Sequence, residues 1–320
     1  MRRELVPGRR LGGFLKSSRR SMIVSASRRT DIPAFYGRWF LNRLRAGHVL
    51  VANPRRRLEV RRVDLDPASI DGIVFWTKNP EDFLSRLPGL DAFEIPYDFL
   101  FTITGYGPSI EPNLPPKRAV IETFKRLSDR LGPERVIWRY DPIFLTPAIG
   151  GDEHLRRFES LARNLEGYTT HVIIAFLTLY RKSRRHMESL KVSLPEPDDA
   201  RRLLLKLKRM AAFRGMTLGT CAVSSECHPE GTARGACIDA RRFERMIGRS
   251  IPMSKDPGQR KECLCVRSVD IGAYDTCAHT CLYCYANASP ATALRNRELH
   301  DPDGPILLPF SGPGGTSSRA

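Results

Sequence analysis

The first 220 residues of this 320-residue chain contain no cysteine, and all eight cysteines lie at or after residue 221. Long hydrophobic runs are also missing, because the longest, HVIIAFLTLY at residues 171–180, falls well short of the ~20 residues that a membrane-spanning helix needs. The first 20 residues lack the apolar stretch of roughly 7–15 residues in a secretory signal. These absences predict a cytoplasmic protein without membrane association, in which clustered cysteines more often bind metal than form disulfides.

Acidic residues are too few to balance the basic ones, and the formal net charge is +17 with a pI near 9.9. Residues 1–20 carry seven Arg or Lys and one Glu, which predicts a basic flexible tail that accounts for +6 of this charge. The remainder of the chain keeps +11, so its body is basic too. Such a field favours polyanionic partners, nucleic acid first among them, although solvated surface charge is the commoner explanation.

A Gly-rich dinucleotide-binding turn and internal repeats are absent. Residues 21–222 instead alternate apolar, β-branched runs with segments of helical period, which is typical of parallel strands joined by helices. The pattern predicts an α/β fold, a TIM-type or partial (β/α) barrel, with residues 21–222 as its main part. The predicted strands lie at 21–27, 71–78, 99–105, 135–141, 171–179 and 216–222, and the clearest helices at 33–46, 115–132, 152–166 and 195–215. In the last helix Asp198 or Asp199 is expected to cap the start.

Residues 223–296 have a different texture and contain most of the cysteines. We expect this region to complete the barrel and to carry a metal-binding loop. A short helix is predicted at ARRFERMIG, one more strand at SVDIGAY (268–274) and a helix at SPATALRNREL. Residues 297–320 are rich in Pro, Gly and Ser and are predicted to be a flexible tail.

Three cysteines gather in DTCAHTCLYCYANAS, at Cys277, Cys281 and Cys284. Three converging thiolates imply a metal, but a zinc ribbon usually presents two C-x2-C pairs and four ligands. The C-x3-C-x2-C spacing, with Tyr283 before the third cysteine, resembles the signature of radical S-adenosylmethionine (SAM) enzymes. The resemblance implies a 4Fe-4S cluster whose open iron binds SAM, reductive cleavage to a 5'-deoxyadenosyl radical, Tyr283 near the adenine, and an electron donor such as flavodoxin or ferredoxin.

Further stretches extend the resemblance. MIVSASRRTDIPAFY, VFWTKNP, ITGYG, WRYDPI and KDPGQRKECLCVRSVDIGAYDTCAHTCLYCYAN together resemble the domain-of-unknown-function family 1848 over about residues 21–290. Its C-terminal cysteines are similar to those of radical SAM proteins, so the resemblance implies a cofactor class and no particular reaction. Thr280 departs from the Gly that we expect in many relatives. The CxYCY motif also resembles that of the spore photoproduct lyase group. Together with the basic body of the chain, this resemblance makes nucleic acid the first guess for the substrate.

The cysteine loop lies near the end of the chain, whereas ordinary radical SAM enzymes carry it after their first strand. A circular permutation explains this, with SVDIGAY as the first strand in space and SMIVSAS beside it. Loops at the carboxyl ends of barrel strands share one face. The resulting catalytic candidates are Asp31, Lys78, Arg139 and Asp141, and the candidates for cofactor binding are Tyr283, Ser25, Ser27, Arg28 and Asn79, with Thr104 as a further contact. Asp31, Asn79 and Asp141 are equally explained as turn and capping residues.

A second set of cysteines, Cys221, Cys237, Cys263 and Cys265, has the composition of a thiolate quartet. It is expected to hold an auxiliary iron-sulfur cluster, with structural zinc as the chief rival, and Cys227 is a spare or a substitute for Cys221. The main hypothesis is a radical SAM enzyme of unknown substrate. The alternative is a non-enzymatic, zinc- or cluster-stabilised protein that binds nucleic acid.

Overall fold

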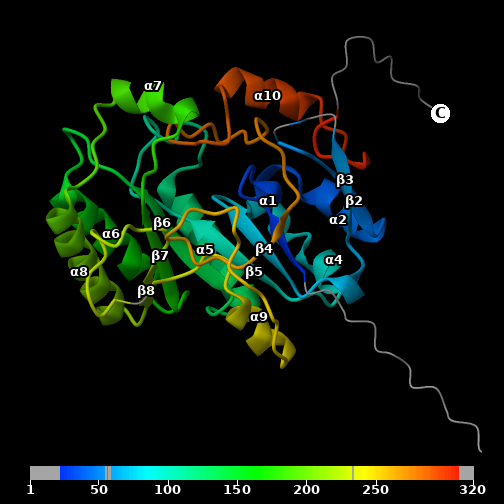
Figure 1. Ribbon diagram of the computed structural model, residues 1–320, viewed down its shortest axis with the longest axis horizontal. Coiled ribbons are helices and arrows are strands. Elements are labelled where there is room, and N and C mark those ends of the chain that lie inside the picture. Colours follow the sequence, from blue (N-terminus) through cyan, green and yellow to red (C-terminus); the bar gives the residue numbers. More distant parts are fainter. Residues whose placement is uncertain (1–21, 55, 57–58, 233, 310–320) are drawn as a thin grey trace, which may run out of the picture.

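A seven-stranded parallel sheet forms the centre of the molecule (Figure 1). The computed structural model describes residues 22–309, except 55, 57–58 and 233. The order across the sheet is β8-β7-β6-β5-β4-β1-β9, with β8 and β9 at the edges of the described sheet, so the α/β fold is an open, partial barrel. The strands are β1 (Ile23–Ala26), β4 (Gly72–Thr77), β5 (Tyr97–Thr102), β6 (Val136–Ile143), β7 (His171–Phe176), β8 (Thr217–Thr220) and β9 (Val269–Asp270), and each agrees with a predicted strand.

The short strand β9 is the last in the chain but lies beside the first. It pairs in parallel with β1, with Val24 opposite Val269 and Ser25 opposite Asp270. In space β9 therefore precedes β1, and β4, β5, β6, β7 and β8 follow in chain order. This is the strand order that the permutation hypothesis predicts, and it attaches the cysteine loop to the start of the sheet.

Amphipathic helices cover one face of the sheet. The longest are α5 (Lys117–Leu131), α6 (Gly151–Leu165) and α8 (Pro197–Phe213), whose apolar stripes pack on strand residues such as Phe99 and Trp138. The predicted helix at 33–46 is two helices, α1 (Ile32–Phe35) and α2 (Gly37–Arg45). The capping prediction for α8 is wrong, because Glu196 is its N-cap and Asp198 and Asp199 lie inside the first turn. Smaller helices are α3 (Glu81–Leu84), α4 (Leu87–Asp91), α7 (Arg181–Ser189) and α10 (Pro290–Glu298).

The cysteine-rich region covers the other face of the sheet. Strand residues Ile23, Val74, Leu100, Ile137 and Ile173 form a second apolar cluster with residues from Cys221 to Cys265 of that region. The helix α9 (Ala240–Ile247) contributes Phe243, which lies so close to Gly72 that a Cβ there would approach its ring to 2.3 Å. Arg242 of α9 donates to the fully buried Asp98 at 2.5 Å. The second cysteine set is thus built into the core.

Two features were not expected from the sequence. An antiparallel hairpin of β2 (His48–Ala52) and β3 (Val60–Asp64) follows α2. The sequence did not predict its second strand, because VRRVD is mostly charged. Residues 297–309 are packed in place of the predicted flexible tail, since Leu50 N donates to Pro305 O, Trp39 Nε1 donates to Gly304 O, and Leu307 is only 2% exposed. The tails predicted at residues 1–20 and 310–320 lie outside the described residues.

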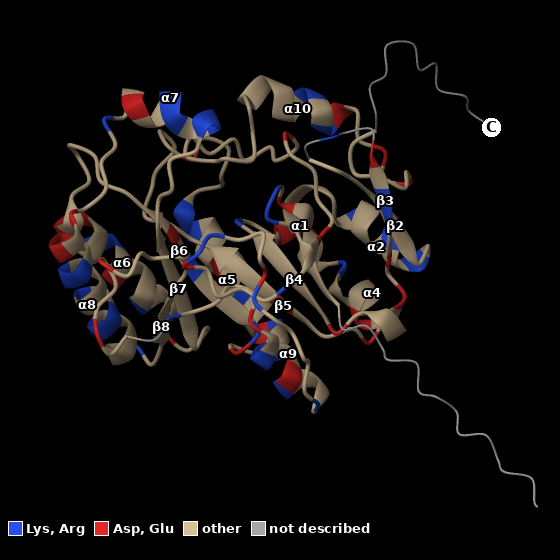
Figure 2. Ribbon diagram, in the orientation of Figure 1, with Lys and Arg blue, Asp and Glu red and all other residues tan. Residues whose placement is uncertain are grey.

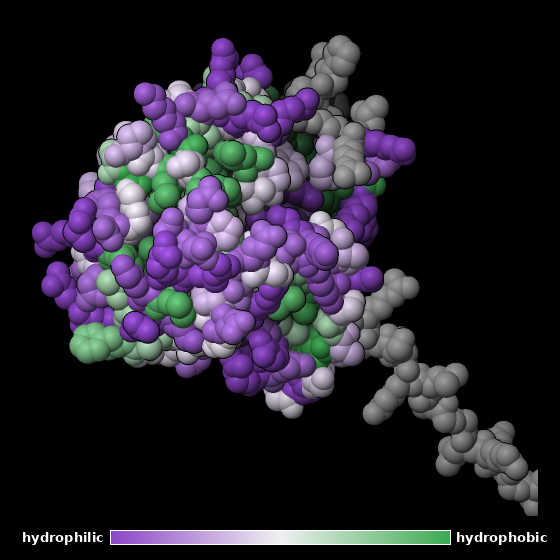
Figure 3. Space-filling view, turned by 60° about the vertical axis from the view of Figure 1, so that its left-hand side comes forward, coloured by the Kyte–Doolittle hydropathy of each residue, from purple (hydrophilic) through white to green (hydrophobic). Residues whose placement is uncertain are grey.

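The surface is mainly polar. On the face turned forward in Figure 3, hydrophobic residues form small patches separated by hydrophilic ones. None of the described helices combines the length and the apolarity needed to cross a membrane.

The ion pair between Arg242 and Asp98 provides a test of how the cysteine-rich region is fixed. Asp98→Ala leaves a guanidinium buried without its carboxylate and should lower the free energy of unfolding by about 3–5 kcal/mol. Urea denaturation measures the change. The exposed Asp129→Ala on α5 is the control, with an expected change within about 0.5 kcal/mol, and equal effects of the two substitutions would contradict this role of the pair.

Candidate metal and cofactor site

Loops that follow the carboxyl ends of the strands enclose a cavity of about 940 Å³. Parallel pairing brings these ends to one edge of the sheet, so segments far apart in the sequence meet there. Arg28 follows β1, Lys78 follows β4, and Cys221 follows β8. The cavity is bordered by seven of the eight cysteines, namely Cys221, Cys237, Cys263, Cys265, Cys277, Cys281 and Cys284.

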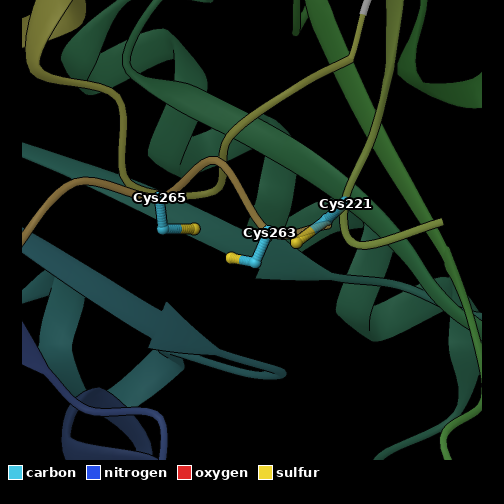
Figure 4. A group of neighbouring side chains, drawn as sticks. All are labelled: Cys221, Cys263 and Cys265. Atoms are coloured by element: carbon cyan, nitrogen blue, oxygen red, sulfur yellow. The ribbon is translucent and has the colours of Figure 1, made fainter. Parts of the chain in front are cut away.

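Three buried thiols of the second set converge on one point. The sulfur atoms of Cys221, Cys263 and Cys265 all lie within 4.8 Å of one another, although Cys221 comes from the end of β8 and the other two from a distant loop (Figure 4). The thiol of Cys237 interacts with those of Cys221 and Cys265. All four are free thiols. The structure therefore brings together the quartet that the sequence predicts, while Cys227 packs against the core on the other face.

The four thiols of the quartet shift one another's pKa values. Hydrogen bonds from the thiols of Cys221, Cys237 and Cys263 hold the pKa of Cys265 well below its usual range. The same interactions raise the pKa of Cys221. The convergence of these buried thiols means that the set could hold a thiophilic cation that displaces their protons.

Two arginines lie over the indole ring of Trp76 on β4. Arg28 comes from the loop after β1, and Arg139 comes from β6. The guanidinium carbons of Arg28 and Arg139 lie 5.4 and 4.8 Å from its centre. Burial alone would lower the pKa of both arginines, but the thiols of the quartet and nearby carboxylates raise it. Arg139 is paired with Asp141, whereas the Arg28 side chain donates only to Ser268 Oγ at 3.4 Å among the described residues. The two guanidinium groups thus bring positive charge close to the thiols of the quartet.

The second loop, with Cys277, Cys281 and Cys284, borders the same cavity. Its sulfur atoms do not all lie within 4.8 Å of one another in the described structure. Burial raises the pKa of Cys281 to about 12 and also raises the pKa of the other two thiols, so this loop too must lose protons when it binds a cation.

Neighbouring amides hold this loop in shape. Asn113 Nδ2 donates to Ala278 O at 2.9 Å and to Thr280 Oγ1 at 3.0 Å, and Asn287 Nδ2 donates to Cys277 O at 2.7 Å. Thr280 has a φ of +51°, a left-handed conformation that a β-branched residue rarely adopts. The expected Gly at this position would adopt it freely, and the hydrogen bond from Asn113 offsets part of the strain.

Glu111 is a site residue that the sequence analysis missed. It is buried, and its carboxylate accepts hydrogen bonds from Lys78 at 2.7 Å, Thr104 at 2.7 Å and Tyr283 at 2.5 Å. Burial opposes ionisation, but Lys78 and Lys117 together lower the pKa of Glu111 to about 2. The only available signal was a lone acidic residue in the long loop after β5. Glu111 fixes the ring of Tyr283 beside the cysteines and keeps Lys78 charged.

Asp31 has both of the roles considered for it. Its Oδ1 accepts from Ala34 N at 3.0 Å and so caps α1. Its Oδ2 accepts from Lys78 N at 2.7 Å and lies 2.9 Å from Nε2 of His279 in the cysteine loop. Capping thus explains Asp31, and the same carboxylate positions the loop.

The remaining candidates divide into two groups. Ser27, Arg28, Lys78, Arg139, Asp141 and Tyr283 line the cavity. Ser25 and Asn79 do not, and Thr104 also lies behind the wall. Ser25 instead donates to Asp270 at 3.0 Å and accepts from Trp76 at 3.0 Å, beneath the floor of the cavity. Neither Ser25 nor Asn79 is among the residues that line the cavity, and their contact with a cofactor stays a prediction.

Comparison with known proteins supplies the family. The model described as "Domain of unknown function (DUF1848)" matches residues 23–286, most of the chain. The chain belongs to this family. The DUF1848 match runs from β1 to the end of the cysteine loop, so both cysteine sets fall within it. No curated protein and no solved structure matches the chain.

Asn113 provides a test of how the loop is held. Asn113→Ala removes both hydrogen bonds to the loop. If the three thiols of the loop hold iron, the variant should retain it roughly 10- to 100-fold less tightly, as loss of residues that orient ligands does. Iron released from reconstituted protein is measured against chelator concentration. Asn164→Ala, which removes an exposed hydrogen bond within α6, should have no effect, and unchanged iron retention in Asn113→Ala would show that the loop holds its shape without this amide.

Proposed function

We propose that this DUF1848 protein is an iron-sulfur enzyme that cleaves SAM reductively, with a cluster on Cys277, Cys281 and Cys284. One observation carries the proposal: three thiols on a single loop border a large cavity at the carboxyl end of a partial barrel. Three thiolates leave one corner of a four-iron cluster for another ligand. When bound, the cluster supplies an electron, received from a donor protein such as a flavodoxin or ferredoxin, that cleaves SAM to methionine and a 5'-deoxyadenosyl radical.

The residues of the chain bind and shelter the cofactor. Arg28 borders the cavity with no ion-pair partner within 4.0 Å among the described residues, and this suits it to the carboxylate of SAM. The carboxylate of Glu111 keeps Lys78 charged. The Nζ atom of Lys78 lies 5.5 Å from the ring centre of Tyr283. Asp31 has all its oxygens engaged, so we assign it to positioning of the loop and not to proton transfer.

Helices restrict access to this end of the barrel. In Figure 1, α7 and α10 stand above the carboxyl ends of the strands, beside the cysteine loop. Lys182 of α7 also contacts Asp275 at 3.4 Å and Tyr274 at 5.0 Å, just before Cys277. A radical needs such enclosure, because closing a site excludes water and side reactions.

We assign the second centre to a cluster with complete thiolate ligation. Cys221, Cys237, Cys263 and Cys265 provide four ligands and leave no open position. The quartet borders the same cavity as the first set. A purely structural zinc would not need this placement, and an electron-carrying cluster would.

Cys281→Ala tests the first centre. Anaerobically reconstituted protein with dithionite and SAM should form 5'-deoxyadenosine, and the variant should form none because the cluster loses one of three ligands. Cys227→Ala removes a thiol outside both sets and should retain the activity. Zinc without sulfide in the wild-type protein, together with no cleavage, would refute the enzyme and favour the metal-stabilised nucleic-acid-binding protein instead.

Cys263→Ala tests the second centre independently. The variant should lose the iron and sulfide of one cluster while it still forms 5'-deoxyadenosine from SAM, because Cys277, Cys281 and Cys284 are untouched. Iron and sulfide per chain, compared with the wild type and with Cys227→Ala, give the result. Loss of zinc with unchanged iron would instead identify the quartet as a structural zinc site.

A further inference from the structure

One helix at the mouth of the cavity presents a row of cations. Arg181, at the start of α7, lines the cavity, and Arg184 and Arg185 follow at i+3 and i+4 on the same face. Ser183 and Met187 are buried on the opposite face. Basic residues dominate α7 in Figure 2. Within the described structure these three arginines form no ion pair within 4.0 Å, so their charge faces solvent at the entrance.

Other segments complete the rim. The loop at Gly258–Arg260 and the hairpin turn at Asn53 and Pro54 both line the cavity, and Arg56 follows that turn. Arg260 donates to Thr178 Oγ1, just beyond β7. Arg56 is paired with Glu59 at 2.8 Å, so the unpaired positive charge at the opening comes from α7 and from Arg260, two distant parts of the chain.

Inside the cavity, basic side chains also outnumber carboxylates. Four carboxylates line the cavity, and each is engaged within the protein: Asp31 by the cysteine loop, Asp141 by Arg139, Asp270 by Ser27 and Arg28 N, and Asp275 by Lys182. The seven basic residues of the lining are Arg28, Arg29, Lys78, Arg139, Arg181, Lys182 and Arg260. Lys78 is also paired with Glu111 behind the lining, but Arg181 and Arg260 form no ion pair among the described residues. Their charge at the mouth favours an anionic occupant.

Aromatic rings alternate with these cations. Trp76 lies between Arg28 and Arg139, and Tyr274 contacts Arg29 and Lys182, with ring-to-cation distances of 4.8–5.4 Å. Tyr180 and Tyr285 pair at 5.0 Å between ring centres, and Tyr180 is 39% exposed at the mouth. All four rings line the cavity. Aromatic platforms within a basic groove are typical of sites that bind unpaired bases of a single strand.

The size of the cavity allows a second ligand beside SAM. Its volume, about 940 Å³, is near the upper limit of about 1,000 Å³ for single small-molecule pockets. A base within a duplex cannot reach such a depth unless it leaves the stack. A flexible strand reaches it directly.

The geometry points to single-stranded nucleic acid as the substrate: α7 and the rim bind the phosphates, and one nucleotide enters the cavity beside the cysteine loop. The chemistry on that nucleotide rests on the proposed function, whereas the binding does not. The rim arginines lie outside the residues assigned to cluster and SAM binding, so the two can be tested separately.

Binding of fluorescein-labelled 12-nucleotide oligothymidylate and oligouridylate to the full, reconstituted chain is measured by anisotropy from 50 to 200 mM salt. Arg184→Glu with Arg185→Glu should weaken binding at least about tenfold and reduce the salt slope by roughly 1.4, two contacts at about 0.7 each. Lys206→Glu with Arg209→Glu makes the same charge change on α8, on the outer face of the sheet, and should change affinity less than about twofold.

Tyr180→Leu tests the aromatic platform. It keeps an apolar side chain at the mouth but removes the ring, and it should weaken binding of the 12-mers about tenfold with an unchanged salt slope. A duplex of the same length that binds as tightly as the single strands, or adenosine monophosphate that binds as tightly as the 12-mers, would overturn the inference in favour of a duplex or a small anion.

SAM cleavage in the same samples separates the two proposals. Cleavage by the wild type without binding of the 12-mers at 50 mM salt would overturn the nucleic-acid inference and leave the enzyme in place. Binding that Arg184→Glu with Arg185→Glu abolishes, without SAM cleavage in any sample, would support the inference and refute the enzyme. We expect the wild type to bind the 12-mers and to cleave SAM. The variant Arg184→Glu with Arg185→Glu should lose binding and keep SAM cleavage.

Discussion

The carboxylate of Asp270 is the contact on which the site depends. This residue ends β9, and it accepts hydrogen bonds from Ser25 and Ser27 side chains and from the backbone N–H of Arg28. The network ties the last strand of the chain to the first and sets where the cysteine loop begins. Because β9 has only two residues, its ladder hydrogen bonds alone would hold it weakly, and these buried bonds to a charged acceptor are about twice as strong as neutral ones.

The two faces of the sheet have different tasks. One face packs against amphipathic helices and provides the apolar core, with rings such as Phe99 and Trp138 at its centre. The other face packs against residues 221–265. This segment brings four thiols and α9 onto the face that would be the interior of a closed barrel. The buried pair of Arg242 and Asp98 anchors this insertion. The four thiols thus lie in the interior of the partial barrel, and the strand ends supply the charges around them.

Sequence patterns predicted the strands and the convergence of Cys221, Cys263 and Cys265, because apolar periodicity and thiol clustering are local or compositional signals. They failed where a residue acts through a distant partner. Glu111 lies in a loop without a motif, and its role follows only from Lys78 and Tyr283, which reach it from other segments. Asn79 has suitable chemistry, but it is not among the residues that line the cavity. The strand β3 is too charged to be recognised, and residues 297–309 pack by their backbone carbonyls, which composition does not reveal.

The position of β9 in the chain also determines when the site is assembled. A ribosome releases the segments of a chain from the N-terminus onward, and early segments fold first. Six of the seven strands are complete before any residue of the cysteine loop is synthesised. The growing chain therefore holds most of the sheet before it holds Cys277, Cys281 or Cys284, and a prematurely ended chain lacks the loop that closes this side of the cavity.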